Sequence, residues 1–129
     1  MKLLLDTHIW LWLLQSPQRL LPHTSRALAD PTNELWLSPI SMWEALTLHR
    51  KGRIRLSAEP VDWLPLALAG IHYEAPLTHE IVLAAHQLRL HGDPADRFLV
   101  ATAQVLDLTL VTADQKLIGL GSIRTMANR

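Results

Sequence analysis

The sequence contains no cysteine among its 129 residues. Disulfide bonds and thiolate metal sites are therefore excluded, and the composition suits a reducing compartment. An excess of charge of either sign is also lacking, because 12 Lys and Arg residues balance 12 Asp and Glu residues. A net charge of zero provides no global basic field, so any binding of nucleic acid has to use a local basic patch.

Long hydrophobic runs are missing as well. The apolar stretch that begins at Leu3 stops at Asp6, and the next one covers only residues 9–14. Neither reaches the roughly 20 apolar residues of a membrane span, and neither forms the core of a secretory signal. We therefore expect a soluble protein of the cytoplasm with no membrane association.

What the chain does contain is a large apolar fraction. Hydrophobic residues make up 49% of the sequence, and the mean hydropathy is +0.12. This composition excludes a disordered chain and indicates a strongly apolar core or a subunit interface. The length predicts one domain, residues 1–129.

Short apolar runs alternate with stretches of helical periodicity. Strands are predicted at residues 2–6, 34–37, 71–77, 109–112 and 122–126. Helices are predicted at residues 24–30, 38–51, 60–68, 78–90, 93–107 and 114–118. Strands separated by helices indicate an α/β fold, a three-layer α/β/α sandwich with a central, mainly parallel sheet. Sheets of this kind bind ligands at the carboxyl ends of their strands.

Four acidic residues occupy the junctions between predicted strands and helices. Asp6 closes the first strand, Glu44 lies in the helix after the second, Asp96 opens a helix, and Asp114 follows the strand 109–112. A carboxylate that interrupts an apolar stretch is costly unless something positive meets it. These four residues are the candidate site.

Helix capping offers an ordinary explanation for three of the four. Ser41 and Glu44 have the spacing of a capping box, and Asp93 could cap the helix that contains Asp96. Thr112 could cap a helix with Asp114 in its first turn. Asp6 has no capping explanation at the end of its strand.

The helical faces argue against capping alone. Glu44 shares a stripe with Ile40 and Leu48, and Asp96 shares one with Leu99 and Val100. A cap has no reason to lie on a buried stripe.

Carboxylates that converge without a cation repel one another and raise their pKa values, whereas a divalent ion with oxygen ligands relieves that repulsion. Mg²⁺ suits a sparse carboxylate site. Neutralisation of one acid by Arg97 is the structural alternative.

Four segments of the sequence together resemble the PIN-domain ribonucleases, and within them the VapC toxins of type II toxin–antitoxin systems. The segments are Leu4-Leu5-Asp6-Thr7-His8-Ile9-Trp10, Ser38-Pro39-Ile40-Ser41-Met42-Trp43-Glu44, Asp93-Pro94-Ala95-Asp96-Arg97-Phe98-Leu99-Val100-Ala101-Thr102-Ala103 and Leu110-Val111-Thr112-Ala113-Asp114. They stand in the order of the family and span essentially the whole chain.

This resemblance implies metal-dependent endonucleolytic cleavage of RNA with Mg²⁺, or Mn²⁺ as a substitute. It implies a catalytic quartet of Asp6, Glu44, Asp96 and Asp114, of which Asp6, Asp96 and Asp114 would hold metal and Glu44 would orient or deprotonate water. It also implies inhibition by a cognate antitoxin protein and a homodimer. The RNA target, the antitoxin and the number of ions stay open.

The same resemblance places polar residues beside the acids. Thr7 and Thr112 occupy positions that could orient ligands or water. Asp93 is an extra acid beside Asp96, and whether it joins Asp96 at the metal stays open.

Other classes of function fit the sequence less well. A phosphatase of the haloacid-dehalogenase type needs a second aspartate two positions after the first, and His8 stands there. No glycine pattern of a phosphate loop and no G-x-S-x-G turn occurs. The remaining alternatives are another metal-dependent phosphohydrolase and a catalytically silent binding module of the same fold, although a silent module would be expected to have lost an acid.

Two further features have open interpretations. Arg50, Lys51, Arg53 and Arg55 form a basic patch that could bind the RNA backbone or be a solvated turn. Five tryptophans could serve a core, an interface or base stacking. Trp10 and Trp12 cannot share one helix face, so we expect one of them at a protein partner.

Overall fold

The computed structural model of the protein describes residues 1–90 and 92–129. Within these residues, five strands form one sheet in the order β3-β2-β1-β4-β5, and every neighbouring pair is parallel. The strands are β1 (Lys2–Leu5), β2 (Glu34–Leu37), β3 (Tyr73–Glu74), β4 (Thr109–Thr112) and β5 (Arg124–Ala127). The prediction of a central parallel sheet is thus confirmed.

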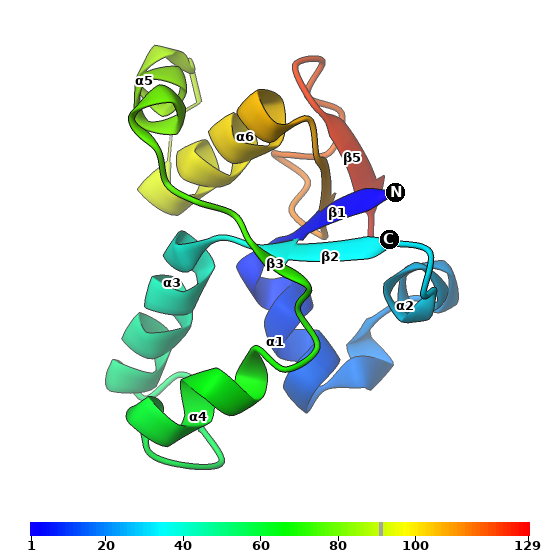
Figure 1. Cartoon of the computed structure of the whole chain (residues 1–129), viewed down its shortest axis with the longest axis vertical. Helices are drawn as coiled ribbons and strands as arrows, with labels where there is room; N and C mark the ends of the chain where they lie inside the picture. The colour runs from blue at the N-terminus through cyan, green and yellow to red at the C-terminus, as the bar shows by residue number, and fades with distance from the viewer. Residues whose placement is uncertain (91) are drawn as a thin grey trace.

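Helices cover both faces of this sheet (Figure 1). They are α1 (Thr7–Gln15), α2 (Pro22–Ala29), α3 (Pro39–Arg50), α4 (Pro60–Ala67), α5 (His79–Gln87) and α6 (Pro94–Leu106), with a short 3₁₀ turn at Pro17–Arg19. In Figure 1, α1 to α4 lie on one side of the strands, and α5 and α6 lie on the other. This arrangement is the predicted three-layer sandwich.

The alternation of side chains along β1 divides the core into two parts. Leu3 and Leu5 pack into the cluster that includes residues of α1 to α4, whereas Leu4 packs with Leu99 and Val100 of α6. Successive residues of a strand point to opposite faces, so a run of leucines serves a sheet that is covered on both sides. All three leucines are completely buried.

Local signals account for the boundaries of α3. The Ser38 hydroxyl accepts a hydrogen bond from the Ile40 amide (3.1 Å), and Pro39 is the first helical residue. Gly52 follows the helix with φ of +71°, a left-handed conformation that glycine adopts without steric cost. The predicted start and end of this helix are confirmed.

Three predicted elements differ from the structure. The strand expected at residues 71–77 is reduced to β3. The Ala75 amide still donates to the Leu37 carbonyl (2.8 Å), but the next residue, Pro76, offers no amide hydrogen to the ladder. The helix expected at 78–90 ends at Gln87, since Leu88 turns extended and packs into the core that α6 builds.

The third difference is the segment after Asp114. The helix expected at 114–118 is a hydrogen-bonded turn in which the amides of Leu117 and Ile118 both donate to the Asp114 carbonyl. The chain then reverses at Gly119, whose φ is +88°. One turn has too few hydrogen bonds to propagate as a helix.

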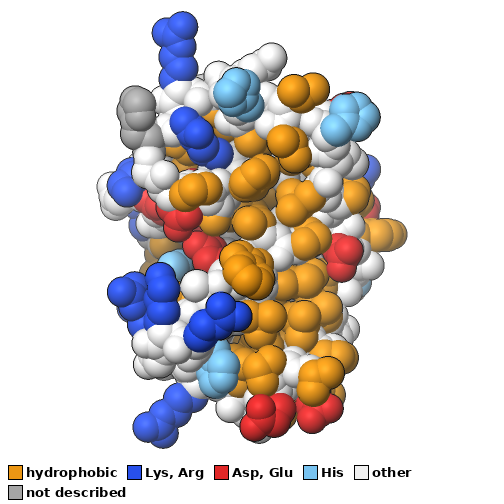
Figure 2. Space-filling model, turned by 90° about the vertical axis from the view of Figure 1, so that its left-hand side faces the viewer, with side chains coloured by type: hydrophobic (Ala, Val, Ile, Leu, Met, Phe, Trp, Pro, Cys, Tyr) orange, Lys and Arg blue, Asp and Glu red, His pale blue; other side chains and the backbone are white. Residues whose placement is uncertain are grey.

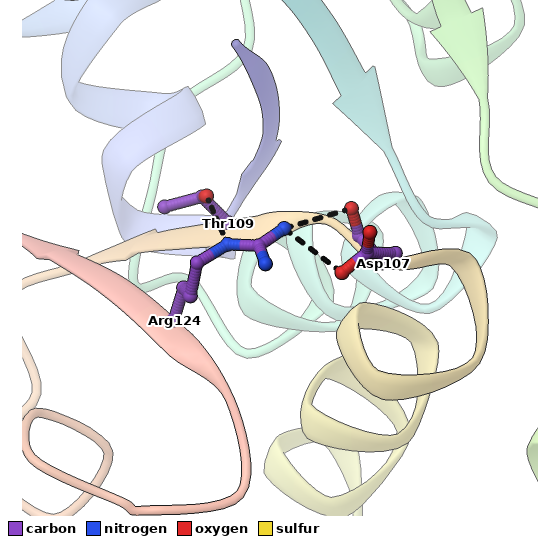
Figure 3. Close-up of polar contacts among 3 residues, drawn as sticks. All are labelled: Asp107, Thr109 and Arg124. Carbon is purple, nitrogen blue, oxygen red and sulfur yellow. Dashed lines mark hydrogen bonds and ion pairs between the residues drawn. The ribbon is translucent and has the colours of Figure 1, made fainter.

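Arg124 of the edge strand β5 makes polar contacts with the end of α6 and the start of β4. The Arg124 guanidinium donates to the Asp107 carboxylate (2.9 Å) and to the Asp107 carbonyl (3.2 Å), and it reaches Thr109 at 3.5 Å (Figure 3). Asp107 holds a left-handed conformation, φ 55°, at the end of α6. Both charged side chains are exposed, so the ion pair contributes about 1 kcal/mol at most.

The strand order places a topological reversal at β1. From β1 the chain proceeds through β2 to β3 on one side and then crosses to β4 and β5 on the other. The carboxyl ends of β1 and β4 are therefore neighbours where the crossovers diverge, which is where such sheets bind ligands. In the part of the chain that the structure describes, no helix has the length and apolar character that a membrane crossing needs.

Candidate functional site

Asp6 lies at the carboxyl end of β1 and begins α1. One oxygen of its carboxylate accepts a hydrogen bond from the His8 amide (3.0 Å), and the other accepts one from the Thr112 hydroxyl (2.6 Å). The expectation that Asp6 has no capping role is wrong, because Asp6 is the N-cap of α1. Its side chain is 7% exposed, and burial raises its pKa although the bond from Thr112 opposes the shift.

Asp114 follows β4 and therefore reaches the same edge of the sheet as Asp6. Its amide donates to the Thr112 hydroxyl (3.0 Å), and its carboxylate accepts a bond from the Lys116 amide (2.9 Å). Thr112 thus contacts both acids, as its predicted position beside them implied. The capping role of Thr112 occurs in a turn and not in a helix.

Glu44 reaches the site from the second turn of α3. The Thr7 hydroxyl hydrogen-bonds to the Glu44 carboxylate and lies 2.9 Å from the Ser41 hydroxyl. Ser41 and Glu44 do not form the capping box that was the ordinary explanation left open for Glu44, because Ser38 caps this helix. Half-burial of Glu44 and the negative charges of Asp93 and Asp6 raise its pKa to about 7.

Asp96 and Asp93 enter from the start of α6. Asp93 caps this helix by accepting a bond from the Ala95 amide (3.0 Å), as predicted. Half-burial raises the pKa of Asp96 to about 6, and the charges of Asp114, Asp6 and Asp93 add to the shift. Asp93 is therefore a cap and at the same time part of the local negative field.

The four candidate acids line one cavity of about 390 Å³. Asp93 lines it too, and the remaining residues around it are His8, Trp12, Ala113 and Lys116. The predicted convergence is present, although it joins residues from both ends of the chain. β1 and β4 supply Asp6 and Asp114 through the sheet, α3 brings Glu44 and α6 brings Asp96; α3 contacts both α1 and α6.

Sequence reasoning overlooked three of these residues: His8, Trp12 and Lys116. A signal existed for each of them. Trp12 stands four residues after His8 on α1, which places both side chains on one helical face, and their rings lie 6.1 Å apart. Lys116 lies two residues beyond Asp114, and its charge lowers the pKa of Asp96.

Arg97 does not neutralise the acids. Its guanidinium Nε donates to the Leu90 carbonyl at 2.8 Å. Across residues 1–90 and 92–129, the single ion pair joins Arg124 and Asp107, away from this cavity. The alternative in which Arg97 neutralises one of the acids is therefore wrong.

The carboxylates of the cavity have the ligand chemistry of a hard divalent ion, but not a complete set of direct ligands. Carboxylate oxygens are the ligands that Mg²⁺ and Mn²⁺ prefer. Burial is the main cause of the raised pKa values of Glu44 and Asp96, and a cation relieves the repulsion that adds to the shift. Among the described residues, no group of three carboxylate or imidazole side chains is arranged to hold one ion directly. An ion that retains several water ligands, as Mg²⁺ usually does, needs only one or two carboxylates in direct contact.

Known proteins resemble this chain in sequence and in fold. A profile of the PIN domain matches residues 3–121. Ribonuclease VapC22 from Mycobacterium tuberculosis is 35% identical over 116 residues, which cover 88% of each chain.

Solved structures show the same fold. VapBC2 from Rickettsia felis, bound to a DNA fragment from its promoter, superposes with a TM-score of 0.69 at 16% identity and 98% coverage of both chains. VapBC-1 from nontypeable Haemophilus influenzae gives a TM-score of 0.69 at 18% identity, again with 98% coverage of both chains.

Proposed function

The chain belongs to the PIN-domain family, and we propose that it is a metal-dependent endoribonuclease of the VapC type, the toxin of a type II toxin–antitoxin pair. The observation that carries this proposal is the convergence of Asp6, Glu44, Asp96 and Asp114 on one cavity. RNA as the substrate is supported by the relative from Mycobacterium tuberculosis, which is named a ribonuclease.

Three of the acids are proposed to hold the cation. Asp6 and Asp96 would hold Mg²⁺ or Mn²⁺, with Asp114 contributing directly or through water. When bound, such an ion offsets the negative charge of a phosphate and makes a coordinated water more acidic. The Thr112 hydroxyl keeps the Asp6 carboxylate in one orientation, so this ligand is positioned before the ion arrives.

Glu44 is proposed to accept the proton of the attacking water. Without metal its pKa is about 7, and the bond from Thr7 orients its carboxylate. A bound cation nearby favours the ionised form, which is the form that accepts a proton at neutral pH. The water oxygen bonds to phosphorus, the proton passes to Glu44, and the bond from phosphorus to the 3′-oxygen breaks. The departing oxygen takes a proton from solvent. The products carry a 5′-phosphate and a 3′-hydroxyl.

Cleavage of an end-labelled RNA tests this function directly. We expect the wild-type protein to cut the RNA with Mg²⁺ or Mn²⁺ and to be inactive with a chelator. Asp6→Asn should remove the activity. Products that end in a 2′,3′-cyclic phosphate would contradict hydrolysis by water, because they require attack by the ribose 2′-hydroxyl. Binding of RNA without cleavage under any metal would identify the silent binding module instead.

Partner proteins are a further part of the proposal. The antitoxin is supported by structural neighbours that are themselves described as VapBC or toxin–antitoxin complexes. Exposed apolar side chains support protein contacts: Val61, which is 80% exposed, and Leu66 lie on α4, and Val82 and Leu83 lie on α5. Figure 2 shows hydrophobic side chains that run as a stripe down one side of the molecule. Large apolar patches of this kind mark interaction sites.

The remaining parts of the proposal concern assembly and location. We place residues 1–129 in a single domain, because one sheet joins segments from both ends of the chain. A homodimer in the cytoplasm is the proposed free state. Light scattering after size-exclusion chromatography tests the dimer, and a monomer at micromolar concentration would contradict it.

A further inference from the structure

A second groove, along α3, continues from the carboxylate cavity. It measures about 350 Å³, within the usual range of small-molecule sites, about 300–1,000 Å³. Glu44 and Asp93 line both the cavity and this groove, so the two spaces share a wall. The rest of the groove includes Trp43, Lys51 and Arg53.

The charges of the groove change along its length. At its acidic end lie Glu44 and Asp93, which also line the carboxylate cavity. At its basic end lie Lys51 and Arg53. Both cations are exposed, and neither forms an ion pair with any residue in the described part of the chain. Figure 2 shows Lys and Arg side chains gathered beside the hydrophobic stripe, close to a group of Asp and Glu side chains.

An exposed aromatic ring lies between these ends. Trp43 is 57% exposed, although the neighbouring positions Met42 and Ala45 of the same helix are buried. The Arg50 guanidinium lies 5.8 Å from the centre of its ring. An indole with a free face and a nearby guanidinium is the usual platform on which single-stranded bases stack.

We propose that this groove binds the nucleotides of the RNA strand that flank the scissile phosphate. A base stacks on Trp43, and the backbone phosphates that follow bind Lys51 and Arg53. Glu44 and Lys51 lie about 10 Å apart along the helix axis at 1.5 Å per residue. A stacked strand carries one phosphate per about 3.4 Å, so two or three nucleotides span the groove. This inference rests on the proposed nuclease function, and it names the part of the site that holds the substrate.

Charge favours RNA over a protein in this groove. Interface cores between proteins are depleted of lysine and of acidic residues, and the groove has both. A nucleic-acid strand instead needs cations spaced along its backbone and a flat ring for its bases. A protein contact at Trp43 is the competing outcome of the test.

The groove is tested by measuring the binding of a fluorescent single-stranded RNA of about ten nucleotides. Every protein in this experiment carries Asp96→Asn, which prevents cleavage of the RNA. We expect Trp43→Ala to weaken binding about tenfold and Trp43→Phe to restore most of it, because phenylalanine keeps a stacking surface. Lys51→Gln and Arg53→Gln should each lower the salt dependence of binding by about 0.7 in the logarithmic slope.

A matched control lies elsewhere on the surface. Arg26→Gln on α2 removes an exposed cation and should bind RNA like the parent protein. Unchanged affinity of the Trp43 and Lys51 variants would overturn the inference, as would a loss of the dimer in Trp43→Ala with RNA affinity intact.

Different results would refute RNA binding in the groove and the nuclease function. If the wild-type protein cuts RNA and Trp43→Ala has the same KM as the wild type, only the groove proposal is refuted. A wild-type protein that neither binds nor cuts RNA refutes both.

Discussion

The Thr112 hydroxyl donates a 2.6 Å hydrogen bond to the carboxylate of Asp6. Asp6 follows β1 and Thr112 is the last residue of the adjacent parallel strand β4; the bond is one of two that hold a buried carboxylate at the carboxyl end of the sheet. The same hydroxyl accepts a bond from the Asp114 amide, so one threonine positions two acids.

Thr112→Val keeps the shape of this side chain and removes its hydrogen bonds. The buried Asp6 carboxylate loses a donor, and we expect the free energy of unfolding to fall by about 1–3 kcal/mol. Affinity for Mn²⁺ should fall as well, because the carboxylate loses its fixed orientation. Urea unfolding and calorimetric titration with Mn²⁺ measure the two effects. Thr125→Val on β5 is the control, and equal effects at both positions would refute the special role of Thr112.

The metal-free protein should lose stability as the pH rises. The pKa of Glu44 is raised from 4.5 to about 7 and that of Asp96 from 3.8 to about 6. Between about pH 4 and 7 the folded protein therefore binds more protons than the unfolded chain, so the free energy of unfolding decreases with rising pH.

Urea unfolding across this pH range with a chelator present measures the effect. Glu44→Gln cannot release a proton at this position, so its stability should depend less on pH than that of the wild type. Identical slopes for the two proteins would contradict the raised pKa of Glu44.

Asp96→Asn should stabilise the metal-free protein and abolish its response to metal. Asparagine removes a half-buried charge that the charges of Asp114, Asp6 and Asp93 oppose. In the wild type, Mn²⁺ at a hundred times its dissociation constant should add about 2.7 kcal/mol, which a thermal melt detects.

An acid in a similar local position provides the comparison for Asp96. Asp62 lies in the first turn of α4 and is exposed. Asp62→Asn should slightly lower stability by removing a favourable charge at a helix N-terminus, and it should keep the response to metal. No shift of the wild-type melting temperature with Mn²⁺ would argue against a metal site in the cavity.

Trp10 and Trp12 should respond very differently to truncation. Trp10 is 1% exposed, packs 5.5 Å from the ring of Trp63, and donates to the Ala67 carbonyl at 3.3 Å. Trp10→Ala should therefore cost about 3–5 kcal/mol of unfolding free energy. Trp12 is only partly buried and lines the carboxylate cavity. Trp12→Ala should cost far less in urea unfolding, and a comparable loss would mean that Trp12 belongs to the core.

Prediction from sequence worked best where neighbouring residues carry the signal. The leucines of β1, the cap at Ser38 and the reversal at Gly52 are local features, and each lies where the sequence predicts it. Prediction worked less well at Asp6, whose cap was overlooked, and at Glu44, where the sequence left open a capping box that the structure does not form. Their hydrogen-bond partners Thr112 and Thr7 are distant in the chain, and no local pattern reveals them.

The sequence by itself determined the alternation of strands and helices, the apolar core and the identity of the acidic residues, because these depend on the period and chemistry of consecutive side chains. Tertiary structure alone decided that the acids share a cavity with Asp93 and Lys116, that Trp10 is buried, and that Trp43 is exposed beside two cations. The physical reason is that strand order and helix packing set distances between residues that are far apart along the chain.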